Sequence, residues 1–193
     1  MVVAMTWLIL GLVLFLGIHT LSTMRGTRAA LIGRLGEGPY KGLYSGIALA
    51  GLVLIVVGFG AYRSAGYVQV WTPPFSIFHP IALVLLWFAF VALVAAYSPP
   101  SRIKHLLRHP LLAGVKAWAL AHLLVNGDLG SMLLFGGLLI WAVYDRISLK
   151  RRGDDGAADV GWSKNDALVV VVATIAYAAM FWLHETLIGV TAA

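Results

Sequence analysis

The chain has 193 residues, of which 61% are hydrophobic and only 11% are charged. Soluble domains carry about 25% charged residues, so this composition indicates an integral membrane protein. The absence of Cys excludes disulfides, thiolate-held metals and iron–sulfur clusters. The net charge of +6 does not indicate nucleic-acid binding, because the basic residues lie in short segments between apolar runs, where membrane orientation accounts for them.

Six apolar runs predict six membrane-spanning helices, since a helix needs about 20 residues to cross a bilayer. The runs are residues 5–23, 43–62, 77–97, 110–125, 129–144 and 167–187. We expect the first to be a retained helix, because no basic residue precedes it and no small-x-small cleavage site follows. The predicted fold class is an all-α helical membrane bundle, with residues 1–193 as a single domain.

The first half of the chain alternates packing helices with short connections. The segment from Arg25 to Lys41 is basic, and we expect its first half to continue as an interfacial helix before a turn at residues 36–39. The second run is rich in glycine, which allows close contact between helices. The third run ends at Ser-Pro-Pro-Ser, residues 98–101, because proline cannot continue the helical hydrogen bonds.

The second half begins with the run that carries the most polar groups, residues 110–125. Asn126 and Gly127 are predicted to end it as a left-handed C-cap. The few residues before the fifth run predict an antiparallel helical hairpin. Residues 146–166 form the one clearly polar segment and are predicted to be a mobile loop.

Membrane orientation follows from the distribution of Lys and Arg. The loops after the first, third and fifth runs hold four, three and five of the fourteen basic residues. Basic loops face the cytoplasm. Both termini are therefore predicted on the non-cytoplasmic side.

The six histidines differ in their expected depth. His79 and His109 each precede a proline, and this position favours a structural role at the start of a helix. His105 lies in a basic loop and is predicted to be solvated. His184 is interpreted as an outer-side anchor, with a ligand role as the alternative. Only His19 and His122 lie inside apolar runs. Ionisable groups there are expensive and are functional candidates.

Two buried imidazoles on different helices are what six-coordinate haem requires, although each could instead bond a backbone carbonyl in a purely structural role. Trp118 and His122 share one helical face, with Asn126 one turn beyond, which suits a large planar cofactor. The basic side chains of Arg25 and Arg28, or of Lys116, are candidates for meeting haem propionates. A zinc site is disfavoured because the interior offers few further ligands.

The fourth run also carries a family resemblance. Arg108-His109-Pro110, Gly114, Trp118, Ala121-His122-Leu123 and Asn126-Gly127 closely resemble the signature of the NnrU family of small bacterial membrane proteins. Gly17-Ile18-His19-Thr20 followed by Arg25, and the region from Arg34 to Tyr44, look like the first helix and first loop of the same family. The resemblance covers nearly the whole chain.

The resemblance implies an association with nitrite and nitric oxide reductase expression in denitrifying bacteria. The family also includes the domain of the plastid 15-cis-zeta-carotene isomerase, a haem-b enzyme with two His ligands in motifs similar to those around His19 and His122. The resemblance therefore implies that His19 and His122 are the two axial ligands of a haem. If this protein is an isomerase, it implies that they are also its catalytic residues. Their predicted depths differ by roughly 10 Å, so His79 and His184 remain alternative partners of His122.

Three functions therefore stand as hypotheses. The first is a bis-His haem-b protein of the bacterial inner membrane that acts in redox or nitrogen-oxide metabolism, with a nitrogen-oxide reductase system as partner. The second is a haem-dependent cis–trans isomerase of zeta-carotene-like polyenes. The third is a cofactor-free membrane assembly or transport subunit. All three place the protein in a lipid bilayer.

Overall fold

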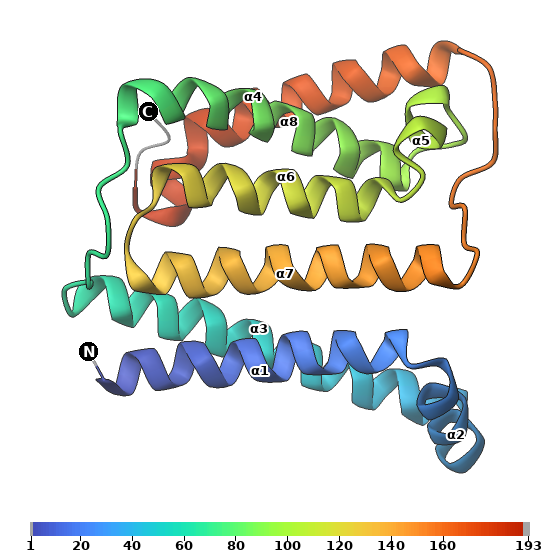
Figure 1. Ribbon diagram of the computed structural model, residues 1–193, viewed down its shortest axis with the longest axis horizontal. Helices are drawn as coiled ribbons and strands as arrows, with labels where there is room; N and C mark the ends of the chain where they lie inside the picture. The colour runs from blue at the N-terminus through green and yellow to red at the C-terminus, as the bar shows by residue number, and fades with distance from the viewer. Residues whose placement is uncertain (1, 191–193) are drawn as a thin grey trace. The chain divides into compact units, whose positions relative to one another are not determined.

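The computed structural model describes residues 2–190, in which all regular structure is helical (Figure 1). Eight helices follow one another along this part of the chain: α1 (Val2–Thr23), α2 (Arg25–Leu35), α3 (Glu37–Ser64), α4 (Phe75–Tyr97), α5 (Arg102–Leu107), α6 (Pro110–Val125), α7 (Leu129–Arg151) and α8 (Lys164–Ile188). The predicted all-α fold is confirmed. The predicted interfacial segment is a helix of its own, α2, which begins at Arg25 and ends before Gly36.

Five of these helices, α1, α3, α4, α7 and α8, are long and apolar enough to cross a membrane. The remaining apolar helix, α6, has only 16 residues, which extend about 24 Å. The chain is therefore a multi-pass membrane protein with five full-length candidate spans and one shorter apolar helix. Many large apolar side chains on these helices are exposed, as expected for surfaces that face lipid.

Several helices extend beyond the apolar runs that predicted them. α3 begins at Glu37 instead of residue 43, and α7 ends at Arg151 instead of residue 144. α4 begins at Phe75, so Pro80 lies inside this helix and not in its first turn as predicted. Helical hydrogen bonding continues into the polar residues beyond each apolar run, so hydropathy alone underestimates the length of these helices. The prediction for Pro110, at the first position of α6, is correct.

The helices form two compact units. Unit 1 comprises Met1–Thr72 and Asn126–Trp141, and unit 2 comprises Pro73–Val125 and Ala142–Ala193. In unit 1 the principal contact is between α1 and α3. In unit 2, α4 packs against both α6 and α8.

The α1–α3 contact is made by glycines. A Cβ on Gly11 would lie 2.6 Å from the backbone nitrogen of Ile55, and one on Gly58 would lie 2.4 Å from that of Leu8. The two backbones therefore touch directly, as small residues allow in membrane helices. The prediction that the glycine-rich run serves packing holds at Gly51 and Gly58, whereas at three other glycines of α3 a Cβ would meet nothing within 4 Å: Gly42, Gly46 and Gly60.

The same unit contains a buried cap at the start of α7. Asp128 is 2% exposed, and its carboxylate accepts hydrogen bonds from the backbone nitrogen of Ser131 at 3.0 Å and from its hydroxyl at 2.6 Å. Arg63 reaches the same carboxylate at 3.4 Å. Asp128 thus satisfies the otherwise unpaired first turn of α7.

Gly127 does not act as the predicted left-handed C-cap, because its φ is not positive. Its carbonyl accepts hydrogen bonds from the backbone nitrogens of Val70 and Trp71. A Cβ on Gly127 would lie 1.9 Å from the carbonyl oxygen of Trp71. Glycine is required here by the close approach of the α3–α4 connection and not by backbone conformation.

Unit 2 is held together by small and β-branched side chains. Four alanines of α4 are almost completely buried: Ala82, Ala89, Ala92 and Ala95. Ala95 joins Val91, Val169 and Ala173 in the core between α4 and α8. On the other side of α4, a Cβ on Gly114 of α6 would lie 3.1 Å from the carbonyl oxygen of Ala89.

Candidate functional site

His19 lies in the last two turns of α1, half-buried, with its ring against Phe15. The ring centroids are 4.3 Å apart, and Nδ1 of His19 lies 2.6 Å from the carbonyl oxygen of Phe15. A carbonyl oxygen only accepts hydrogen bonds, so Nδ1 must carry the proton. In the neutral imidazole this leaves the lone pair on Nε2, the atom that ligates a metal when Nδ1 is anchored in this way.

Three aromatic residues complete the surroundings of His19. Tyr44 of α3 and Trp141 of α7 each place a ring centroid 5.6 Å from that of His19, with Trp141 edge-on at 85°. Tyr40 lies 6.4 Å from Tyr44, ring to ring. We call Phe15, Tyr40, Tyr44 and Trp141 the His19 cradle; all four belong to unit 1.

The cradle contains two buried hydrogen-bond donors that have no partner. They are the hydroxyl of Tyr40 and the indole nitrogen Nε1 of Trp141. Tyr40 as a whole is only 6% exposed. Such groups are rare in native structures, and each calls for an explanation, such as a ligand that accepts the hydrogen bond.

His122 repeats the local arrangement of His19 on α6 of unit 2. Its Nδ1 lies 2.8 Å from the carbonyl oxygen of Trp118, four residues earlier, and the two ring centroids are 5.0 Å apart. The same reasoning assigns the proton to Nδ1 and the lone pair to Nε2. Both interior imidazoles are thus oriented by their own helix beside an aromatic ring.

The other predicted cofactor contacts lie at the edges of these helices. Arg25 is the exposed first residue of α2, two positions after α1 ends at Thr23. Asn126 is half-buried just beyond the end of α6, in the short connection that precedes the capping Asp128. Trp118 is placed beside His122, as its spacing predicted.

The alternative partners of His122 also lie in unit 2. His184 lies on α8, and its Nδ1 is 2.7 Å from the carbonyl oxygen of Val190. His79 stacks on Phe75 with centroids 4.3 Å apart. For His184 the bond to Val190 anchors Nδ1 and leaves the lone pair on Nε2.

His105 and His109 both bind a loop that comes later in the chain, a contact that the sequence did not indicate. His109 makes this contact from its predicted position at the start of a helix, directly before α6. His105, predicted to be solvated, bonds the carbonyl oxygen of Ala157 through Nδ1 at 3.1 Å, while its Nε2 lies 3.4 Å from the Asp159 carboxylate. His109 bonds the carbonyl oxygen of Asp154 at 3.1 Å. Both histidines therefore hold the loop of residues 152–163 against α5 and the start of α6.

Two arginines add ion pairs to the same loop. Arg102 pairs with Asp159, and Arg108 pairs with Asp155 at 3.1 Å. The polar segment predicted to be mobile is thus a shorter loop fastened by its aspartates. The sequence signal for this contact was the pairing of two segments of opposite charge, the basic residues in 102–109 and the aspartates in 154–159.

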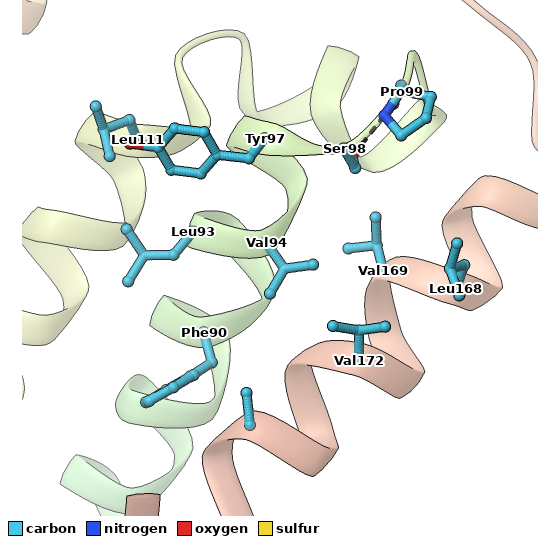
Figure 2. A pocket seen from close by; sticks show the side chains of 11 residues that line it. Phe90, Leu93, Val94, Tyr97, Ser98, Pro99, Leu111, Leu168, Val169 and Val172 are labelled. Carbon is cyan, nitrogen blue, oxygen red and sulfur yellow. Dashed lines mark hydrogen bonds between the residues drawn. The ribbon is translucent and has the colours of Figure 1, made fainter.

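Unit 2 also carries an apolar groove of about 580 Å³ between α4, α6 and α8, shown in Figure 2. Its lining includes Phe90, Leu93, Tyr97, Leu111 and Val172. His122 is not among the lining residues. Leu111 and His122 are eleven residues apart on α6, about 16 Å along its axis, so the groove lies at the other end of this helix from the imidazole.

Within residues 2–190, no three His, Asp or Glu side chains come together in a way that could hold a metal ion. The arrangement offers single imidazoles beside aromatic rings, which suits a cofactor that brings its own equatorial ligands.

Comparison of the chain with curated proteins and with solved structures gave no match. The family described as NnrU protein matches residues 7–192, nearly the whole chain. The motifs around His19 and His122 both fall inside this match. The chain belongs to the NnrU family.

Proposed function

We propose that this protein binds haem b in the membrane, with His122 and His19 as the axial ligands. The observation that carries the proposal is the shared geometry of the two imidazoles. Each donates Nδ1–H to a carbonyl of its own helix, at 2.6 Å for His19 and 2.8 Å for His122, and leaves Nε2 as the acceptor. Metal-ligating histidines are typically oriented by such a bond from the second ring nitrogen.

The residues present fit a haem. Porphyrin supplies four equatorial nitrogens, so the protein needs to add only one or two imidazoles. The chain has no Cys to compete as a ligand. Each imidazole lies beside at least one aromatic ring, and such rings would suit the face of a flat macrocycle.

Bound haem would supply a one-electron couple. The residues of this chain hold and orient the imidazoles. Phe15 and Trp118 fix the two rings, and the cradle shields His19 from water. Because haem carries a one-electron couple, we propose redox or nitrogen-oxide metabolism as the wider function. The link to denitrification comes from the family resemblance.

Isomerisation of a polyene stands as the second candidate because of the apolar groove in unit 2, which would accept an extended hydrocarbon. The groove lies about 16 Å along α6 from His122. His122 is not among the residues that line the groove, so the groove by itself gives a substrate no contact with this imidazole. The geometry therefore favours the redox proposal over the isomerase.

We also propose that the protein resides in the bacterial inner membrane with both termini outside the cytoplasm. Support comes from α2 and α5, which carry basic residues at the ends of α1 and α4, and from the basic end of α7. Under the positive-inside rule these three regions face the cytoplasm.

The test is the absorption spectrum of the detergent-purified chain, oxidised and reduced, after expression with ample haem. The proposal predicts a Soret band that is lost in His122→Ala and in His19→Ala and kept in the control His105→Ala, whose side chain binds a loop. If the band is kept in His19→Ala and lost in His184→Ala, the second ligand is His184 and not His19. A colourless protein that co-purifies with partners would instead indicate the assembly or transport subunit.

A further inference from the structure

The hydroxyl of Tyr40 is a buried donor without an acceptor. Tyr40 lies in the first turn of α3, 6% exposed, and no described atom bonds its hydroxyl. Burying a hydroxyl without a hydrogen bond destabilises the folded state, because the group loses its bonds to water and gains none. Phenylalanine would fill the same space without this cost, so the hydroxyl points to an acceptor that belongs to a ligand.

The electrostatic surroundings of Tyr40 are positive. The guanidinium of Arg28, on α2, lies 5.9 Å from the Tyr40 ring centroid. The neighbouring carboxylate of Glu37 is engaged by Lys41, with Nζ 2.7 Å from Oε1. A hydroxyl donor beside a guanidinium, with the local acid already paired, favours an anionic acceptor.

The position of Tyr40 in the cradle relates this acceptor to His19. The rings of His19, Tyr44 and Tyr40 follow one another with centroid separations of 5.6 Å and 6.4 Å. Tyr40 is therefore separated from the imidazole by one aromatic residue, and the Arg28 guanidinium lies beyond it, over the Tyr40 ring. A ligand held at its centre by His19 would present its edge to Tyr40.

We propose that Tyr40 and Arg28 bind a carboxylate at the edge of the ligand that His19 holds, which in haem b is a propionate. This inference rests on the proposed function. The Tyr40 hydroxyl donates one hydrogen bond to the carboxylate, and the guanidinium donates a second and neutralises its charge. By holding this carboxylate, Tyr40 and Arg28 would help to orient the bound ligand.

The proposal is tested by comparing haem with haem dimethyl ester, in which both propionates are methylated and uncharged. The purified chain, depleted of haem, is titrated with each compound, and binding is followed at the Soret band. The wild type should bind the acid about tenfold more tightly than the ester, as expected for the loss of a charge-assisted hydrogen bond. Tyr40→Phe and Arg28→Gln should each reduce this preference at least about threefold while the Soret band remains.

Two variants serve as matched controls. Tyr97→Phe removes a hydroxyl from a side chain that is 82% exposed, and Arg34→Gln removes the same charge from the same helix as Arg28. Both should keep the wild-type preference for the acid. An unchanged preference in Tyr40→Phe and Arg28→Gln would overturn the inference and leave the axial ligands untouched. Loss of all haem binding in the wild type would overturn the proposed function, and this inference with it.

A second readout uses the haem-depleted protein. If the hydroxyl awaits a ligand, Tyr40→Phe should leave the haem-depleted chain at least as stable as the wild type in thermal denaturation and should reduce the stabilisation that added haem gives. A lower melting temperature of the haem-depleted variant would assign the hydroxyl a structural role instead, and would contradict the proposal.

Discussion

Trp141 meets His19 edge-on, with ring centroids 5.6 Å apart and planes at 85°, although 122 positions separate the two residues in the chain. This contact fixes one side of the imidazole, while Phe15 fixes another. Edge-to-face aromatic contacts are worth about 0.5–1.5 kcal/mol beyond the area that they bury. The orientation of His19 therefore depends on α7 as well as on its own helix.

Trp141→Ala should loosen His19, because the substitution removes a ring from the cradle. We expect a loss of about 2 kcal/mol in unfolding free energy, less than for a fully buried Trp, and a lower haem content per protein. Trp141→Phe keeps an aromatic edge and removes the unpaired N–H, so it should stay within about 1 kcal/mol of the wild type. Denaturation in detergent, with the ratio of Soret to protein absorbance, measures both effects. Equal losses in the two variants would contradict this account.

Gly58→Leu should separate α1 from α3. Its Cβ position lies 2.4 Å from the backbone nitrogen of Leu8, so no rotamer relieves the clash. Overpacking of this kind costs about 1–3 kcal/mol or more. Gly60→Leu, two residues away on the same helix with nothing within 4 Å of its Cβ position, is the matched control. Unfolding is measured by titration with a denaturing detergent and followed by circular dichroism. The unfolding midpoint should fall for Gly58→Leu and stay at the wild-type value for Gly60→Leu. Similar midpoints for the two variants would show that the helices are not in backbone contact.

Asp128→Ala should destabilise the start of α7. The substitution leaves the backbone nitrogen of Ser131 and the guanidinium of Arg63 without their acceptor. We expect a loss of about 2 kcal/mol, within the range for N-caps and buried hydrogen bonds. Asp155→Ala, whose side chain is 91% exposed, should change stability by less than about 0.5 kcal/mol. Thermal denaturation of the two variants checks the difference, and a neutral Asp128→Ala would exclude the capping role.

Gly156→Ala should release the 152–163 loop. Gly156 has φ +79°, and its Cβ position lies 2.2 Å from the carbonyl oxygen of Arg108, which accepts a hydrogen bond from the backbone nitrogen of Ala157. Alanine therefore meets both backbone strain and a clash. Trypsin should cleave near Arg151 and Arg152 about tenfold faster than in the wild type, because local opening governs proteolysis. Gly161→Ala, with open space around it, should cleave at the wild-type rate.

The class of protein and its two interior imidazoles could be predicted from the sequence. Hydropathy and charge are local properties summed along the chain, and a bilayer demands long apolar helices, so these runs determined an all-α membrane fold. The same rule singled out His19 and His122, because an imidazole inside an apolar run is visible without any tertiary contact. The aromatic residue four positions before each, Phe15 and Trp118, was equally visible as a helical neighbour.

The surroundings of those imidazoles were decided only by the tertiary structure. Tyr40 and Trp141 join His19 from α3 and α7, and no periodicity links residues so far apart in the chain. The role of Gly127 likewise depends on the carbonyl of Trp71, and that of His105 on a loop about fifty positions later. Hydropathy predicts which segments enter the membrane. Which helix faces pack against each other depends on the close packing of particular side chains. Packing is a property of the folded chain as a whole.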